Sequence, residues 1–223
     1  MTCTELVNIL TPALSPCINF SGVCKDDATW DPKAGHIPRG FGGANNRACA
    51  VKLILVTAEP GSPSDGESYS EGDPEVMLRQ HIEFFERIFR EDGLRRGGRH
   101  APFHSGLRTI LDLCWPEPEM GLEEKLSLTW FTNAVKCPAA TSGGKIPRGI
   151  EETCVSSYVK REIEALPNAY VLALGEKARK RLRAADVRVD GHAQHPSARR
   201  NTNPQASWEE AAKQFRDWVS HRP

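Results

Sequence analysis

A mostly apolar run at positions 51–56, VKLILV, ends abruptly at a corner of sequence TAEPG. A short β-branched run bounded by Pro and Gly is typical of a strand buried on both faces of a parallel sheet. Ligands of open α/β sheets bind beyond the carboxyl ends of such strands. Glu59, followed by Pro60 and Gly61, therefore stands where a catalytic carboxylate is expected. An inert acid in an ordinary strand-to-loop turn is the alternative.

The rest of the chain alternates predicted strands with predicted helices. Strands are expected at 126–135, 169–174 and 187–189, and helices at 73–92, 150–165, 176–184 and 208–219. Within 101–114 a helix face is expected from Leu107 to Leu113, with Phe103 in the loop that leads into it. Such alternation implies a parallel sheet covered on both faces. We expect one α/β domain over residues 1–223, with three layers and a short, mainly parallel, four-stranded central sheet flanked by helices. Positions 15–48 are rich in Gly, Pro, Asp and Asn, which predicts a long irregular segment with a function or a clamp.

Charge and hydropathy restrict the class of protein only loosely. The 223 residues include 29 Lys and Arg against 29 Asp and Glu, so net charge argues neither for nor against nucleic acid. No apolar run has the length that a membrane span needs. The first residues lack a basic stretch and include Glu5, which argues against a secretory signal. The expectation is a soluble, cytoplasmic monomer that does not contact membranes.

Polar residues stand at or just beyond the expected strand ends. They are Glu59, Asn133 and His195, together with Gly175. Because the carboxyl ends of parallel strands meet at one edge of a sheet, an acid, an amide and an imidazole are expected to lie there together. The pattern supports a catalytic cleft without naming a reaction.

Several motifs together resemble the uracil-DNA glycosylase superfamily. TAEPG, WFTNAVKCP and HPSARR follow one another in the order and rough spacing of that superfamily. APFHSGL resembles the segment that precedes a helix in its iron–sulfur members, and ETCVSSYVKREIEALPNAYVLALGEKA resembles their helix–strand–Gly unit. The resemblance covers most of positions 51–200. It implies a monofunctional enzyme that flips uracil out of DNA and hydrolyses its N-glycosidic bond, leaving an abasic site.

The resemblance also implies roles for individual residues. Phe103 would stack on uracil, and the Asn133 amide would bind N3–H and O4 of the base. Glu59 would stabilise the sugar cation and orient water, while His195 would stabilise the departing uracil anion. The main-chain neighbours Ala58 and Gly61 would complete the uracil-binding pocket.

The first motif departs from the iron–sulfur pattern GEAPG. In this chain the acid directly precedes Pro60, as the catalytic Asp or Asn does in other branches, and Ala58 replaces the usual acid. The water-handling role is therefore expected at Glu59, with Asp65 or Glu67 in the following loop as alternatives.

Local clusters of positive charge are the expected DNA contacts. Ser197, Arg199 and Arg200 follow the histidine in the position of the family's minor-groove loop, and Lys145 and Arg148 would contact phosphates. Two other functions remain open: a module that binds damaged DNA or abasic sites with little turnover, and an α/β enzyme acting on a free nucleoside or nucleotide.

Seven cysteines are many for a reducing compartment, where metal binding or buried thiols are expected rather than disulfides. Cys137 and Cys154 match two cluster ligands of the iron–sulfur branch, and Cys17 and Cys24 are the candidates for the other two. The resemblance thus implies a 4Fe–4S cluster, which needs four thiolates. Cys17 and Cys24 are spaced more widely than the family's close pair, so loss of the cluster stays open. The remaining cysteines are expected to be ordinary thiols.

Overall fold

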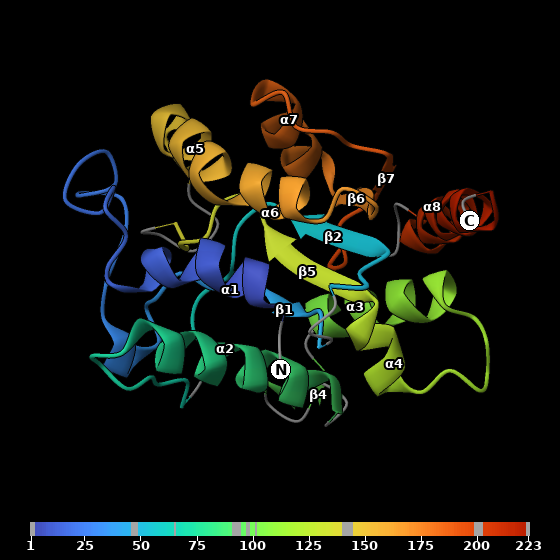
Figure 1. The fold of residues 1–223 in the computed structure, drawn as a ribbon, viewed down its shortest axis with the longest axis horizontal. Helices are drawn as coiled ribbons and strands as arrows, with labels where there is room; N and C mark the ends of the chain where they lie inside the picture. Colours follow the sequence, from blue (N-terminus) through green and yellow to red (C-terminus); the bar gives the residue numbers. More distant parts are fainter. Residues whose placement is uncertain are drawn as a thin grey trace.

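The computed structural model describes residues 3–45, 49–64, 66–90, 95–96, 99–100, 102–139, 145–198 and 203–221, with only the backbone at 95–96 and 99–100. Its fold is α/β, as expected, and is built on one five-stranded sheet of order β1-β5-β2-β6-β7 (Figure 1). The strands are β1 Gly42–Gly43, β2 Leu53–Thr57, β5 Thr129–Asn133, β6 Tyr170–Leu174 and β7 Gly191–Ala193. Four of them are parallel, and β1 pairs antiparallel with β5. A separate hairpin joins β3 Arg95–Arg96 to β4 Arg99–His100.

Helices cover both faces of the sheet and make three layers. Along β2, Leu53 and Leu55 point into one apolar cluster and Ile54 and Val56 into the other, because successive side chains of a strand alternate. One face is covered by α1 Thr4–Leu10, α6 Lys160–Ala165 and α7 Glu176–Ala184, and the other by α3 Pro102–Cys114, α4 Leu122–Ser127 and α8 Pro204–Ser220. Helix α2, Pro74–Arg90, lies along the β1 edge and contributes to both clusters (Figure 1). No helix in the described ranges is long and apolar enough to cross a membrane.

The strand order creates one switch point in the parallel sheet. The first parallel strand, β2, lies between the second, β5, and the third, β6. The chain therefore builds outward from β2 in one direction and then in the other, which makes the boundary between β2 and β6 the switch point. Open α/β sheets bind their ligands at such a point.

Three boundaries differ from expectation. The fourth parallel strand is β7, not 187–189, because the Val187 amide closes the end of α7 on Leu182 O, and pairing with β6 begins only at Gly191. The chain before β5 is helical up to Ser127. Phe103 lies within the first turn of α3 rather than before it, since Pro102 occupies a first-turn position that suits proline.

The long segment at 15–48 is largely irregular but is not loosely attached. It contains only a 3-10 turn at Pro32–Ala34 and strand β1 among its described residues, yet Ile37 and Phe41 are fully buried. A disulfide joins Cys3 to Cys49, with Cα atoms 5.1 Å apart, so the expectation of ordinary thiols was wrong for this pair. The two cysteines bracket the segment, which makes the crosslink a clamp on it. Cys114 is a buried free thiol, as expected.

Candidate active site

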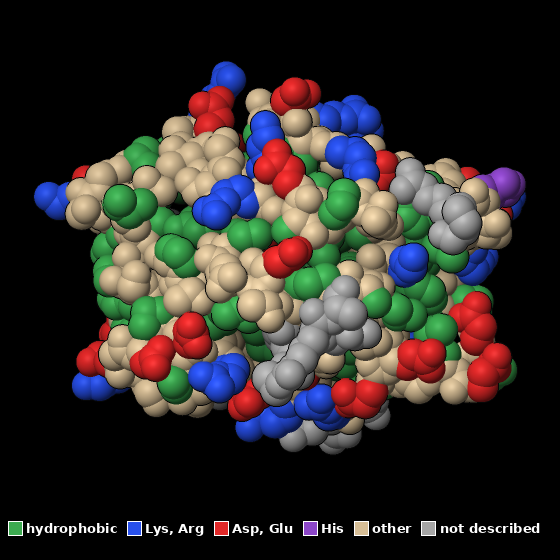
Figure 2. Space-filling model, in the orientation of Figure 1, with side chains coloured by type: hydrophobic (Ala, Val, Ile, Leu, Met, Phe, Trp, Pro, Cys, Tyr) green, Lys and Arg blue, Asp and Glu red, His purple; other side chains and the backbone are tan. Residues whose placement is uncertain are grey.

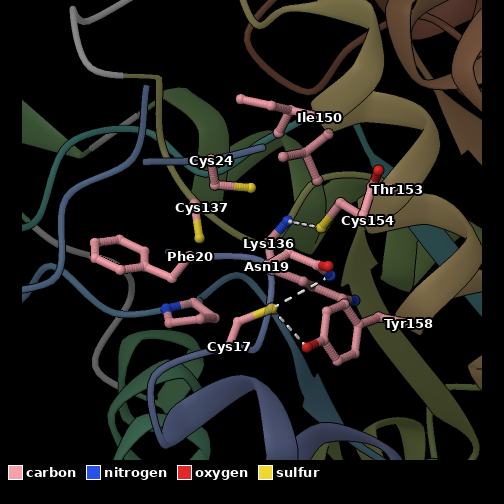
Figure 3. Close-up of a pocket in the computed structure, with 12 residues that line it drawn as sticks. Cys17, Asn19, Phe20, Cys24, Lys136, Cys137, Ile150, Thr153, Cys154 and Tyr158 are labelled. Carbon is pink, nitrogen blue, oxygen red and sulfur yellow. Dashed lines mark hydrogen bonds between the residues drawn. The ribbon is translucent and has the colours of Figure 1, made fainter. Parts of the chain in front are cut away.

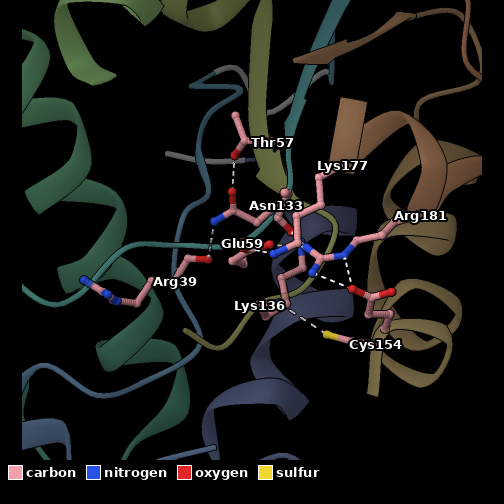
Figure 4. Close-up of polar contacts among 10 residues, drawn as sticks. Arg39, Thr57, Glu59, Asn133, Lys136, Cys154, Lys177 and Arg181 are labelled. Carbon is pink, nitrogen blue, oxygen red and sulfur yellow. Dashed lines mark hydrogen bonds and ion pairs between the residues drawn. The ribbon is translucent and has the colours of Figure 1, made fainter. Parts of the chain in front are cut away.

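Glu59 lies two residues beyond β2, and two cationic side chains hold it. Its side chain is 17% exposed. Lys177 Nζ lies 2.5 Å from one carboxylate oxygen, Oε1, and the Arg181 guanidinium donates to the other, Oε2 (Figure 4). Both cations come from α7, which follows β6. The acid therefore sits at the switch point with two cationic partners.

Asn133 is the last residue of β5 and lies opposite Thr57 in the parallel register. The Thr57 hydroxyl donates to its Oδ1, and its Nδ2 donates to Arg39 O over 3.3 Å (Figure 4). A Cβ at Gly40, where φ is +82°, would lie 1.6 Å from Nδ2, so the amide requires glycine there. An amide offers two hydrogens and two lone pairs, and these two contacts, within the described part of the chain, use one of each.

A buried ion pair fixes the loop that follows Glu59. Arg39 Nη1 lies 3.1 and 2.9 Å from the two oxygens of Glu67, and its Nη2 donates to Gly61 O. Tyr69 and the Ser64 amide also donate to Glu67, over 2.6 and 2.8 Å. Both oxygens of Glu67 are thus engaged, which favours a structural role over the handling of water. Asp65, the other alternative, lies outside the described residues.

His81 extends this buried network toward Gly40. Its Nε2 accepts from the Gly40 amide over 3.1 Å, and its Nδ1 lies 2.9 Å from the Tyr69 hydroxyl. Burial lowers the pKa of His81 to about 3, and the positive charge of Arg39 adds to the effect. The ring is therefore neutral, with its proton on Nδ1.

His195 lies two residues beyond β7, beside Phe103. The Ser197 amide donates to His195 Nδ1 over 3.1 Å, which leaves the proton of the neutral ring on Nε2. Burial lowers the pKa of His195, and the Glu59 carboxylate partly offsets this. The ring centroids of Phe103 and His195 are 5.6 Å apart. Acid, imidazole and aromatic ring are thus brought to the same edge.

Close packing holds the HPS turn, residues 195–197, against α3 and β6. A Cβ at Gly106 would lie 2.2 Å from Pro196 O, and one at Gly175 would lie 3.2 Å from the Cβ of His195. Glycines at these two positions let the turn approach the helix and the strand end closely.

The predicted DNA contacts are only partly described. Ser197 and Lys145 are exposed, and the side chain of Arg148 is 83% exposed and pairs with Glu152 over 2.6 Å. Arg199 and Arg200 lie outside the described residues. Basic side chains over α7 are interspersed with acidic ones in the face that Figure 2 shows, so this region is not a patch of a single sign. Ala58 and Gly61 were predicted to complete a uracil-binding pocket. Ala58 is buried and Gly61 is exposed.

The four cysteines proposed as ligands line a single pocket. Cys17 and Cys24 reach it from the irregular segment, Cys137 from the chain after β5, and Cys154 from α5, Arg148–Cys154 (Figure 3). Most of the other lining is apolar and includes Phe20, Pro38, Val135 and Ile150. The wide spacing of Cys17 and Cys24 therefore does not keep them apart from the other pair.

Hydrogen-bond donors surround two of these sulfurs. The Tyr158 hydroxyl donates to Cys17 Sγ over 2.9 Å, and the Lys136 amide donates to Cys154 Sγ over 3.3 Å (Figure 3). Burial raises the pKa of Cys24 and Cys137, and raises that of Cys154 to about 11. Without a metal these three side chains are therefore neutral thiols, and iron binding would have to displace their protons.

Arg39, Lys177 and Arg181 contact the site residues and were missed in the sequence. A helical spacing of four puts Lys177 and Arg181 on one face of α7, directly after the Gly that ends β6, and that signal was available. Arg39 had no such signal, because its segment has no periodicity.

The fold and the site define an α/β protein with an acid, an amide and an imidazole at the carboxyl edge of its sheet. In comparisons with known proteins, no protein-family model matches this chain, and no curated protein matches its sequence.

Proposed function

We propose that this protein is a DNA glycosylase that flips uracil out of DNA and hydrolyses its N-glycosidic bond. The observation that carries the proposal is the pairing of His195, whose Nε2 carries a proton, with Glu59 and Phe103 at the switch point. A departing uracil anion needs a donor, and the sugar cation needs a carboxylate.

The residues divide the work of cleavage as follows. The flipped base stacks on Phe103, and the free lone pair and hydrogen of the Asn133 amide bind N3–H and O4. The bond from C1′ to N1 breaks with its electron pair going to uracil, whose O2 accepts from His195 Nε2. Glu59 stabilises the positive charge on the sugar, orients the water whose oxygen adds to C1′, and accepts the proton that this water loses.

The decisive experiment incubates the protein with a uracil-containing duplex and cleaves abasic sites with alkali. We expect cleavage by the wild type and a loss of about 100-fold or more in Glu59→Gln. Glu176→Gln removes another ion-paired acid, at the start of α7, and serves as the control with unchanged activity. An inactive wild type would refute the proposal, and full activity of Glu59→Gln would move the role of water handling elsewhere.

A second candidate is a module that binds abasic sites with little turnover. It is favoured by the two counter-ions on Glu59 and by the internal hydrogen bonds of Asn133. Such a module would bind abasic duplex tightly without releasing uracil. Either function predicts that binding weakens steeply with salt, because phosphate contacts release counter-ions.

We also propose that Cys17, Cys24, Cys137 and Cys154 hold a 4Fe–4S cluster. The donor set fits: four thiols share one largely apolar pocket, and N–H and O–H donors face the sulfurs. Bound there, the cluster would supply a structural tie between the irregular segment, β5 and α5. Brown protein with iron and sulfide in equal amounts supports this, whereas colourless, iron-free and fully active protein contradicts it. Cys114→Ser, which changes a buried thiol outside this pocket, is the control and should keep the colour and the iron.

A further inference from the structure

The two oxygens of Glu59 are held by cations of very different exposure (Figure 4). Arg181, which holds Oε2, has a side chain that is 3% exposed. Lys177, which holds Oε1, has a side chain that is 47% exposed. One end of the carboxylate is therefore held from the protein interior and the other from the surface.

Arg181 has further partners that fix its guanidinium. Nη1 donates to Ala58 O over 2.7 Å, Nε donates to Glu151 Oε1 over 2.7 Å, and Nη2 lies 2.6 Å from the same oxygen. The planar fork of an arginine gives such a set a definite geometry. Moving it would leave buried charges without partners, which is strongly unfavourable. Arg181 therefore sets the direction of the acid and ties it to α5.

Lys177 has no comparable anchor among the described residues. Within that part of the chain its one ion pair is with Glu59, and an ammonium on a flexible stem near the surface gains little from such a contact. Water or a phosphate can replace the carboxylate as its partner at small cost.

From this asymmetry we propose that Arg181 is a positioning residue for Glu59, and that Lys177 is a displaceable counter-ion. Arg181 keeps Oε2 fixed and directs Oε1 toward the sugar. When DNA binds, Lys177 leaves Oε1 for a backbone phosphate, and Oε1 becomes the oxygen that faces the sugar cation and the water. The catalytic part of this inference rests on the proposed glycosylase function, whereas the difference in anchoring does not.

Two double-mutant cycles test the anchoring without any activity. Urea midpoints are measured for Arg181→Gln and Lys177→Met, each in the wild-type and the Glu59→Gln background. We expect Arg181→Gln to lower the midpoint more in the wild-type background than in the Glu59→Gln background, and Lys177→Met to shift it equally in both. Equal coupling of both cations to Glu59 would overturn the proposal, even if the protein cleaves no uracil. If Arg181→Gln does not fold, Arg181→Lys replaces it in the cycle.

The same variants test the catalytic part by single-turnover cleavage of a uracil duplex. We expect Arg181→Gln to slow cleavage about 100-fold with KM changed less than about threefold, since positioning affects the chemical step. In the Glu59→Gln background the same change should cause no further loss. Additive losses would show that Arg181 does not act through Glu59. An inactive wild type would instead refute the proposed function and leave the stability cycles to decide the anchoring.

Lys177→Met is tested by binding rather than by cleavage, because Lys177 contacts Glu59 and is proposed to contact a phosphate. Its affinity for abasic duplex should fall, and the slope of log affinity against log salt should become smaller by about 0.9, as for the loss of one phosphate contact. Lys213→Met, which changes an exposed lysine on α8, is the matched control and should change neither. An unchanged salt slope for Lys177→Met would show that Lys177 does not move to a phosphate.

Discussion

The orientation of the Asn133 amide is determined by its neighbours rather than by its own rotamer preference. Arg39 O can only accept, so Nδ2 must face it and Oδ1 must face Thr57. In this orientation the remaining lone pair and hydrogen match a base edge with N–H beside C=O. A reversed amide would suit an amino edge, but it would set two oxygens against each other.

Thr57→Val removes the hydroxyl and keeps the shape of the side chain. We expect a loss of about 1–3 kcal/mol in the free energy of unfolding, because Oδ1 of Asn133 is left buried with one partner fewer. Urea unfolding measures this. Thr109→Val, which removes a hydroxyl bonded to Ser105 O on α3, should cost less. Equal losses in the two variants would contradict the anchoring of Asn133 by Thr57.

His81 should make stability depend on pH. Its pKa is depressed from 6.5 to about 3 in the folded chain, so below pH 6.5 the unfolded chain binds a proton that the folded chain does not. Stability is therefore full above pH 6.5 and falls as the pH drops toward 3, by about 1.4 kcal/mol per pH unit for this proton.

His81→Gln isolates that contribution, because Gln can accept from the Gly40 amide and does not titrate. Between pH 6 and pH 4 the slope of unfolding free energy should become shallower by about one proton relative to the wild type. The half-buried His104, whose pKa burial lowers to about 4, should keep its own part of the slope in both proteins. Identical slopes in the two proteins would show that His81 is accessible to protons.

At the scale of elements, the contact between α3 and the HPS turn depends on Gly106. Gly106→Ala places a Cβ against the backbone of Pro196, which cannot move as a flexible side chain does. We expect a loss of about 1–3 kcal/mol in stability and slower cleavage, since His195 moves with its turn. Gly121→Ala, where a Cβ meets nothing within 4 Å, is the control and should be neutral in both measurements.

Elements with a strong local signal were predicted from the sequence. Helix α7 has the expected bounds, and β5 and β6 lie within the expected strands. Strand β2 overlaps the expected run at 51–56 and extends one residue beyond it, to Thr57. Strand β7 was misplaced because Gly191 and His192 carry no β-branched signal, and its pairing depends on Asp190, whose carboxylate accepts from the Val171 amide over 2.8 Å. Strand β1 consists of two glycines and has no side-chain pattern at all.

The site residues on strand ends could be predicted because the carboxyl ends of parallel strands meet at one edge of the sheet. The partners of these residues could not be predicted. Arg39 comes from a segment without periodicity, and its contacts with Gly61 and Glu67 depend on how that segment packs against the sheet. The Cys3–Cys49 disulfide could not be predicted from the number of cysteines and an expected reducing compartment, because it depends on how the irregular segment brings the two residues together.

At the scale of the whole molecule, the Cys3–Cys49 crosslink closes a loop with a sequence separation of 46. In the chain-entropy model such a loop stabilises the fold by about 4 kcal/mol. We expect reductant to lower the urea midpoint of the wild type accordingly. The double variant Cys3→Ser, Cys49→Ser should start at the lower midpoint and not respond to reductant. A wild type indifferent to reductant would contradict a crosslink with this effect.

The two ends of the sheet bear on how the molecule behaves in a crowded solution. One edge strand is β1, which pairs with β5 and has only two residues. The other edge strand is β7, which has three. Long, exposed edge strands pair with strands from other chains, whereas edge strands this short offer few backbone groups for such pairing. Strand-to-strand aggregation is therefore disfavoured, although the centre of the sheet is made of the apolar strands most prone to it.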